Sequence, residues 1–252
     1  MFTVEPQPTQ ADLHFRLADV SVRVSVWFWA AAALLGWSVC QALAGGEQRQ
    51  LLGYLIIWMG VVVLYILVHE MGHALAYRRY GVDSRVVLVH FGGITIPARW
   101  GGSSVRQPIQ RIAVSAAGPL AQLAVTAGLV LLLKLGGYRV PFPIETVGTA
   151  LGLFDGNPLP NRTLAITIIF LLQVNVFWPL LNLLPVPPLD GGQIMREGLL
   201  LGGVRDATRV AAMVGAVTGG LVAYWAFTNG QEYMAILFVV LAVSCYRSLQ
   251  GP

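Results

Sequence analysis

His69, Glu70 and His73 form the pattern His-Glu-x-x-His, whose residue types and spacing suit metal-assisted hydrolysis. On a helix, side chains four residues apart lie one turn above each other, so both imidazoles can bind one metal ion. Glu70 projects beside them, where its carboxylate can accept a proton from a water that the metal polarises. We therefore expect His69 and His73 to be zinc ligands and Glu70 to be a general base.

The same motif has a purely structural explanation, in which two buried histidines and a glutamate pair with neighbouring polar groups. Burying ionisable groups in an apolar environment is costly, so this alternative requires a separate partner for each of them. One metal ion accounts for all three residues. We therefore favour the metal site.

A catalytic zinc ion needs a third protein ligand and one open position, and Asp190 is the best candidate for that ligand. It follows the proline-rich segment 182–189 and precedes two glycines, which allow the backbone to pass close to a neighbour. The alternative is that Asp190 only caps the next helix, because Gln193 three residues later completes a capping box. We expect Asp190 to complete a site for one zinc ion per chain.

The composition places these residues in a membrane protein. Of the 252 residues, 56% are hydrophobic and 11% are charged, whereas soluble domains carry roughly 25% charged residues. The net charge of +4 comes from arginines scattered between apolar segments, so no basic stripe indicates nucleic acid as a partner. Both cysteines lie in apolar segments, which argues against a disulfide framework and against a cysteine zinc cluster.

Six apolar stretches are long enough to cross about 30 Å of hydrocarbon as helices. They cover residues 24–44, 51–78, 110–135, 164–185, 207–227 and 231–248. The first is longer than the apolar core of a signal peptide, so we expect it to be retained. The sequence therefore predicts an all-α polytopic membrane protein embedded in the lipid bilayer.

An even number of spans puts both termini on one side of the membrane. Four of the 16 basic residues, Arg49, Lys134, Arg139 and Arg162, fall on the other side, and the remaining twelve share the side of the termini. The positive-inside rule then predicts cytoplasmic N and C termini, in what we expect to be the cell membrane. The histidines late in span two and Asp190 after span four both lie toward the cytoplasm, so the predicted site assembles there.

The β-branched run 85–97 lies between the second and third spans and is split by Gly92-Gly93, which predicts a β-hairpin with its turn at the two glycines. An unpaired strand edge cannot face lipid, so the hairpin must lie in protein, in a watery cavity or at the interface. Its edge could receive an extended substrate segment as an added strand. We interpret His90, beside the glycines, as a structural residue and not as a ligand.

Asn175 and Asn182 lie seven residues apart, on one face of span four. Amides in a membrane helix either bond between helices or point at a polar site. Near a metal, Asn182 could donate a hydrogen bond to the substrate or to a developing oxyanion.

Taken together, the His-Glu-x-x-His helix and the run Asn-Leu-Leu-Pro-Val-Pro-Pro-Leu-Asp-Gly-Gly resemble the site-2 protease family of intramembrane zinc metalloproteases. The resemblance covers about residues 51–195. The hairpin is similar to the family's membrane-associated β element, and residues 117–121 match its span-three motif. Gln122, however, stands where asparagine is expected. The resemblance implies zinc bound by His69, His73 and Asp190, with Glu70 as general base and Asn182 as a polar group on the substrate side.

The resemblance also implies the domain organisation and the reaction. We expect a single transmembrane metalloprotease domain over residues 1–252, with its catalytic core at about 51–195, a polar segment at 1–23 and a C-terminal helix pair at about 207–248. It would hydrolyse peptide bonds within or near transmembrane helices of membrane-protein substrates. Members of the family often carry a regulatory domain, for which this chain has no room. We therefore expect a minimal core, with a separate regulatory or adaptor protein as a candidate partner.

Two other functions are compatible with the same residues. In a metal or proton transporter, His69, Glu70, His73 and Asp190 would line a path, but spans one, three and five contain no acidic residue to continue it. A catalytically inactive scaffold that binds membrane helices is the second alternative. The intact Glu70 argues against it.

Overall fold

The computed structural model describes residues 7–89, 92–98 and 105–250. Within them, six helices are long and apolar enough to cross a membrane: α1 (Val26–Ala44), α2 (Gln48–Arg79), α3 (Pro108–Leu135), α5 (Arg162–Asn182), α7 (Ala207–Thr228) and α8 (Glu232–Leu249). These helices confirm the six predicted spans and the multi-pass membrane architecture. The fourth span ends three residues earlier than predicted, because the proline-rich segment cannot continue the helix.

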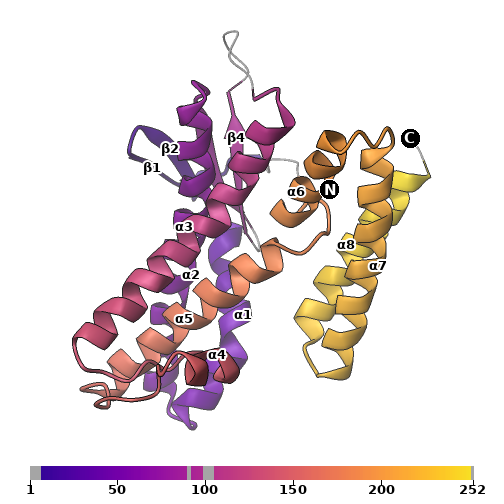
Figure 1. The fold of residues 1–252 in the computed structure, drawn as a ribbon. Helices are drawn as coiled ribbons and strands as arrows, with labels where there is room; N and C mark the ends of the chain where they lie inside the picture. Colours follow the sequence, from indigo (N-terminus) through magenta and orange to yellow (C-terminus); the bar gives the residue numbers. More distant parts are fainter. Residues whose placement is uncertain (1–6, 90–91, 99–104, 251–252) are drawn as a thin grey trace.

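Two shorter helices complete the helical part of the fold. Helix α4 (Glu145–Ala150) lies in the loop between α3 and α5, and α6 (Asp190–Leu201) follows the proline-rich segment. Figure 1 places α4 at one end of the molecule, whereas α6 and the strands lie toward the other end. The loop and the proposed site are therefore separated by the length of the bundle.

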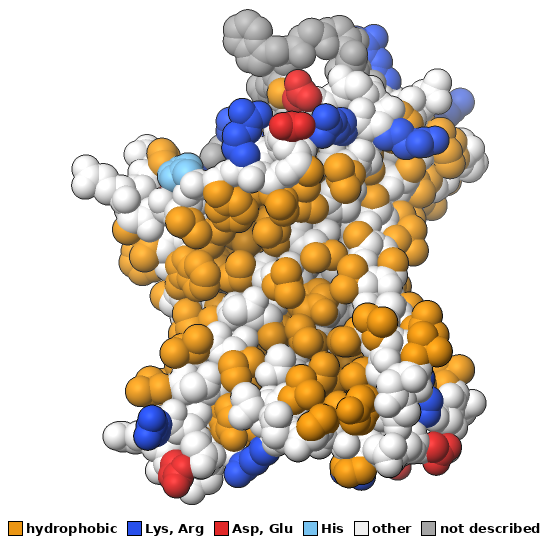
Figure 2. Space-filling model, turned by 90° about the vertical axis from the view of Figure 1, so that its left-hand side faces the viewer, with side chains coloured by type: hydrophobic (Ala, Val, Ile, Leu, Met, Phe, Trp, Pro, Cys, Tyr) orange, Lys and Arg blue, Asp and Glu red, His pale blue; other side chains and the backbone are white. Residues whose placement is uncertain are grey.

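The helices form two groups. Helix α2 packs against α1, α3 and α5, while α7 packs almost entirely against α8. Helix α6 contacts both α3 and α7, so it connects the two groups, as Figure 1 shows. In Figure 2 a broad band of apolar side chains crosses the face of the bundle between two ends where charged side chains gather. This distribution matches a molecule whose middle lies in hydrocarbon and whose ends lie in water.

The predicted hairpin is half of a larger sheet. Strands β1 (Leu13–Leu17), β2 (Val20–Val24), β3 (Ser84–Val89) and β4 (Gly92–Pro97) pair in that order, and only the β2–β3 pair is parallel. The polar segment expected at residues 1–23 thus also contributes β1 and most of β2, which the sequence analysis did not predict. The valines of β2 alternate with polar residues, as in a strand, but they lie directly before the apolar first span. The strand pattern was therefore read as the beginning of that span.

The glycine pair does not form the turn of the hairpin, which corrects the interpretation of the sequence. Gly92 and Gly93 open β4 and pair with Val89 and Leu88 of β3. A Cβ atom added at Gly93 would lie 2.3 Å from Cγ of Glu70, so glycine here permits a close approach between β4 and α2. His90 lies outside the described residues.

Helices α2 and α3 approach each other at glycine. A Cβ atom on Gly72 of α2 would lie 2.5 Å from the main-chain oxygen of Ala117 in α3. Small residues allow membrane helices to approach this closely, and the contact is made by the helix surface that carries the His-Glu-x-x-His motif. The fold therefore sets this motif directly against α3.

Candidate metal centre

The three predicted ligands come together at the meeting point of α2, α3 and α6. The Nε2 atoms of His69 and His73 lie 3.1 Å apart. Oδ2 of Asp190 lies 3.1 Å from the His69 nitrogen and 3.4 Å from the His73 nitrogen. Both histidines are buried, and Asp190 is partly buried. Within the described residues, these three side chains form the group that could hold a metal ion.

The spacing of these atoms fits zinc. In a tetrahedral site with zinc–nitrogen bonds of about 2.0–2.1 Å, two ligand atoms lie about 3.3 Å apart. The three measured separations, from 3.1 to 3.4 Å, match three corners of such a tetrahedron and leave the fourth corner for another ligand. Two imidazoles and one carboxylate are also a ligand set that zinc uses in catalytic sites.

Hydrogen bonds to α3 orient both imidazoles. His73 Nδ1 lies 2.7 Å from the main-chain oxygen of Val114, and His69 Nδ1 lies 2.9 Å from Oε1 of Gln122. When Nδ1 donates its proton to such an acceptor, Nε2 of a neutral imidazole keeps a free lone pair, as a metal ligand must. Lone pairs and a carboxylate oxygen this close together repel each other unless a metal ion or a proton lies between them. The donor set therefore fits a bound metal ion.

Glycine makes room for the ligands on α3. A Cβ atom on Gly118 would lie 2.3 Å from Nε2 of His73 and 2.9 Å from Nε2 of His69. Val114, Gly118 and Gln122 recur at intervals of four residues, so they lie on one face of the helix. This face of α3 both holds the histidines and leaves space for what they bind.

Asp190 is the first residue of α6 and does not act as its cap. Leu189 occupies the capping position, and no side chain caps the helix there. The N-terminus of α6 favours a negative charge at its first residue, which suits Asp190 as an anionic metal ligand.

The glycines after Asp190 let the proline-rich segment fold back on the start of α6. A Cβ atom on Gly191 would lie 2.0 Å from the main-chain oxygen of Leu183, and one on Gly192 would lie 2.3 Å from the nitrogen of Pro187. No larger residue fits at either position without moving the backbone. The predicted role of this glycine pair, a close backbone approach, is confirmed.

An ion pair between a buried glutamate and a partly exposed arginine joins α6 to α3 seven residues beyond Asp190. Glu197 is 1% exposed, and its Oε1 accepts hydrogen bonds from Arg196 and, at 3.4 Å, from Nη1 of Arg111 in α3. Gly118, which lies beside the same histidines as Asp190, is seven residues beyond Arg111. The two contacts therefore run in opposite directions along the two helices, so α3 and α6 are antiparallel. Without these two arginines the buried Glu197 carboxylate would be an uncompensated charge. Its contact with Arg111 joins α6, and Asp190 with it, to α3.

Glu70 is held by the sheet. The Thr95 hydroxyl of β4 lies 2.7 Å from Oε2 of Glu70 and 3.0 Å from the Glu70 main-chain oxygen. Gly93, two residues earlier and so on the same face of β4, contacts the same side chain. Strand β4 therefore fixes one carboxylate oxygen of Glu70.

Sequence reasoning did not assign Thr95, Val114 or a role for Gln122. The Thr95 contact joins residues 25 positions apart, and the Val114 contact uses a main-chain atom that any residue would supply. Gln122 did carry a signal, because it departs from the family motif. Its partner could be identified only from the packing of α2 on α3.

The side chains of Asn175 and Asn182 in α5 form hydrogen bonds within their own helix and not with the three ligands. The Asn175 amide donates to the Leu171 main-chain oxygen at 2.7 Å, and the Asn182 amide donates to that of Trp178 at 3.2 Å. Both bonds lie within α5. The buried Asn175 oxygen has no hydrogen-bond partner within the part of the chain that the structure describes.

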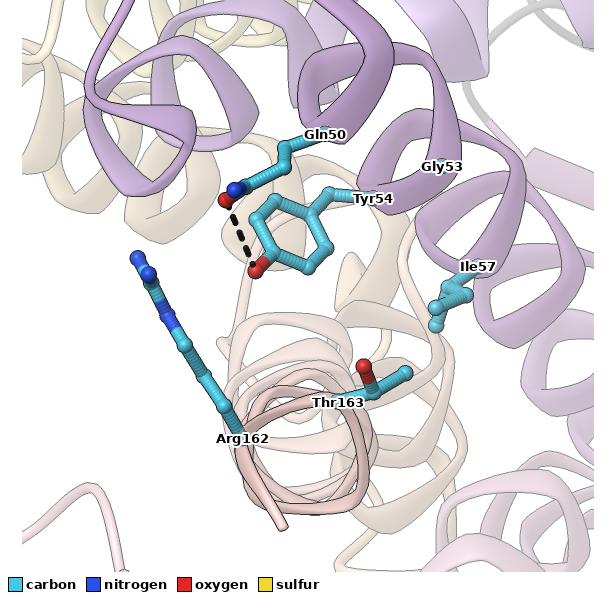
Figure 3. A pocket seen from close by; sticks show the side chains of 6 residues that line it. All are labelled: Gln50, Gly53, Tyr54, Ile57, Arg162 and Thr163. Carbon is cyan, nitrogen blue, oxygen red and sulfur yellow. Dashed lines mark hydrogen bonds between the residues drawn. The ribbon is translucent and has the colours of Figure 1, made fainter. Parts of the chain in front are cut away.

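A separate hollow lies between α2 and α5 at the far end of the bundle (Figure 3). Its volume is about 390 Å³, and it is lined by Gln50, Gly53, Tyr54, Ile57, Arg162 and Thr163. The Arg162 guanidinium donates to the main-chain oxygen of Leu43. Gln50 precedes His69 by 19 residues, which is about 28 Å along the helix. The hollow is therefore not part of the metal centre.

Comparison with known proteins identifies the family of the chain and several similar proteins. A model of peptidase family M50 matches residues 54–223. Rip3 of Mycobacterium tuberculosis, which carries the name of a zinc metalloprotease, is 31% identical over 208 residues, covering 80% of this chain and 44% of Rip3. A Synechocystis protein with the same kind of name, sll0528, is 26% identical over 159 residues, or 62% of this chain and 35% of that one. The chain spans less than half the length of these curated relatives.

A solved structure shares the fold. The site-2 protease from Methanocaldococcus jannaschii superposes with a TM-score of 0.56 at 15% sequence identity. The match covers 94% of this chain and 95% of the other. At this identity the likeness concerns the fold alone.

The space at Gly118 gives a testable prediction. Gly118→Ala keeps every ligand but puts a methyl group against both Nε2 atoms, and overpacking of about 1–3 kcal/mol should weaken zinc binding by roughly 10- to 100-fold. Gly128→Ala is the matched control, since it lies in the same helix and a Cβ atom there meets nothing within 4 Å. Zinc competition with a chelator measures both variants. Equal affinity in Gly118→Ala and wild type would contradict the assignment of the site.

Proposed function

The chain belongs to peptidase family M50, the site-2 protease family, and on this premise we propose that it is an intramembrane zinc metalloprotease. It hydrolyses peptide bonds within or near the transmembrane helices of its substrates. The observation that carries the proposal is the triangle formed by Nε2 of His69, Nε2 of His73 and Oδ2 of Asp190. Its dimensions suit zinc, and it lies on a membrane helix next to Glu70.

His69, His73 and Asp190 hold the metal ion in this proposal. When bound there, zinc supplies Lewis acidity, which polarises a carbonyl and lowers the pKa of a water. Glu70 takes the proton from the attacking water and delivers it to the nitrogen of the scissile amide as the C–N bond breaks. The Thr95 hydroxyl bonds to Oε2 of Glu70, so Oε1 is the carboxylate oxygen proposed to accept this proton.

Asn182 is proposed to bind the substrate. It lies in the last turn of α5, directly before the proline-rich segment that leads to Asp190. Its amide can exchange the bond to the main-chain oxygen of Trp178 for one to a substrate carbonyl or developing oxyanion. This role rests on the place of Asn182 in the family motif.

One transmembrane metalloprotease domain accounts for the whole chain in this proposal. The core at about 51–195 contains both histidines, Glu70, the β3–β4 hairpin, the face of α3 that bonds to the histidines, and Asp190. The C-terminal pair supports the proline-rich segment, since the Cys245 thiol donates to the main-chain oxygen of Pro187 at 3.1 Å. Substrate choice then depends on this core or on a separate adaptor protein.

The proposed orientation puts the metal centre toward the cytoplasm of the cell. Twelve of the 16 basic residues share the side of the termini, and the positive-inside rule assigns that side to the cytoplasm. The sheet and α6 lie at this end (Figure 1). We therefore propose a cell-membrane protein with cytoplasmic N and C termini.

Strand β4 is the proposed docking edge for substrate. A transmembrane helix resists hydrolysis because its carbonyls are already hydrogen-bonded, so a segment must unwind before attack. Among the described strands β4 has one neighbour, β3, and its face contacts Glu70. A segment added to the free edge of β4 would therefore lie next to the general base.

A proline substitution in β4 tests this docking edge. The N–H of Ala98 donates to Asp83 beside β3, so by alternation the N–H of Thr95 points to the free edge of β4. We expect Thr95→Pro, which removes this donor, to lower cleavage of a transmembrane substrate at least about tenfold relative to Thr95→Val, which loses the hydroxyl but keeps the donor. Thermal unfolding of each variant reports whether the sheet has survived. Equal cleavage by the two variants would exclude docking on β4.

The experiment that tests the function requires no known substrate. Wild-type protein and Glu70→Gln are reconstituted in vesicles with membrane proteins from the source organism, and new protein N-termini are identified by mass spectrometry. We expect new termini within or near transmembrane helices with wild type and a loss of at least about 1,000-fold in Glu70→Gln, because the general base is absent.

The transporter alternative makes the opposite prediction in the same vesicles. A transporter would move zinc or protons across the membrane without producing new termini, and zinc uptake that survives Glu70→Gln would favour it. Absence of both cleavage and transport, with membrane helices still bound, would favour the scaffold.

A further inference from the structure

The two histidine ligands are held by chemically different groups on α3. His73 Nδ1 bonds to the main-chain oxygen of Val114, 2.7 Å away. A main-chain carbonyl only accepts hydrogen bonds, so neutral His73 must carry its proton on Nδ1. The His73 ring therefore presents the lone pair of Nε2 to the metal whether or not the metal is bound.

His69 is held instead by a side-chain amide. Oε1 of Gln122 lies 2.9 Å from His69 Nδ1, and the Gln122 side chain is fully buried. Its other end, the NH₂ group, has no hydrogen-bond partner among the described residues. An amide carries an acceptor and a donor of nearly equal size, so turning it by 180° exchanges one for the other. Because the NH₂ group of Gln122 has no partner, rotating the amide breaks no hydrogen bond of that group.

The two orientations of the amide select two forms of His69. With Oε1 toward the ring, His69 carries its proton on Nδ1 and its Nε2 lone pair binds metal. With the NH₂ group toward the ring, Nδ1 accepts and the proton lies on Nε2. That proton then points at Oδ2 of Asp190, which is 3.1 Å away and accepts it. Both arrangements satisfy the imidazole, but only the first can bind zinc.

We propose that Gln122 is the positioning residue of the metal ligand His69, and that its amide turns over between a zinc-binding and a zinc-free arrangement. The inference rests on the zinc site of the proposed function and deepens it. His73 is a permanent ligand, whereas His69 is the ligand through which zinc is gained and lost. A glutamine at this position thereby stabilises the metal-free site, which an acceptor alone would not do.

Three variants of the chain test the proposal. Gln122→Met keeps the length of the side chain but removes both hydrogen-bonding ends, and Gln122→Glu supplies an acceptor alone. Thr126→Val is the matched control, because Thr126 is buried one turn further on α3 and donates to the main-chain oxygen of Gln122 instead of to a histidine.

The measurements are the zinc dissociation constant, by competition with a fluorescent chelator, and the rate of zinc release. Loss of the bond to a metal-ligating histidine typically costs roughly 10- to 100-fold in affinity, so we expect a loss of that size in Gln122→Met. Gln122→Glu should bind zinc at least as tightly as wild type and release it more slowly. Thr126→Val should stay within about twofold of wild type.

A ¹⁵N spectrum of the histidines distinguishes a Gln122 that orients the His69 ring from one that only fills space, because it reports which ring nitrogen carries the proton. The chain has 4 histidines, so ¹⁵N labelling of histidine gives a spectrum that can be assigned. In metal-free protein we expect the His69 proton on Nε2 in wild type and on Nδ1 in Gln122→Glu. His73 should carry its proton on Nδ1 in both proteins.

The possible results are distinguishable. Wild-type affinity and release in Gln122→Met would overturn the positioning role, and equal weakening in Gln122→Met and Gln122→Glu would show that Gln122 only fills space. If Gln122→Met does not fold, release from Gln122→Glu that is no slower than from wild type overturns the proposal. A wild-type chain that binds no zinc would refute the proposed function itself.

Discussion

The close approach of α2 and α3 is the constraint on which the rest of the structure depends. Imidazoles inside a membrane helix need hydrogen-bond partners, and α3 supplies one acceptor for each Nδ1 atom, from Val114 and from Gln122. These acceptors are within reach only because Gly72 and Gly118 let the two helices come together. The same contact orients both Nε2 atoms toward a common point. The same face of α3 therefore packs against α2 and orients the two histidines for metal binding.

The remaining elements each deliver one group to this pair of helices. Helix α6 runs back along α3, and the ion pair between the buried Glu197 and Arg111 joins the two helices where Asp190 closes the ligand triangle. Strand β4 crosses α2 at Gly93 and fixes the Glu70 carboxylate through Thr95. The sheet is thus part of the proposed catalytic apparatus, since the strand proposed to receive the substrate also holds the general base.

Much of this arrangement was predictable from the sequence, because the signals were local. Six apolar stretches gave the spans, and the spacing of His69 and His73 placed both rings on one helix face. The contacts of Gln122 and Thr95 were not predictable, because they join residues 53 and 25 positions apart and depend on helix packing and strand register. Gly92-Gly93 was misread as a turn, because a glycine pair needed for a close approach has the same sequence pattern as one needed for a turn.

Metal content tests the central claim most directly. Elemental analysis of detergent-purified wild type, Glu70→Gln and His73→Ala counts zinc ions per chain without any substrate. The proposed site predicts about one zinc per chain in wild type and in Glu70→Gln, where all three ligands remain, and little or none in His73→Ala. A freshly purified wild type without zinc, or zinc that persists in His73→Ala, would contradict the assignment of the metal centre and of the peptidase activity that depends on it.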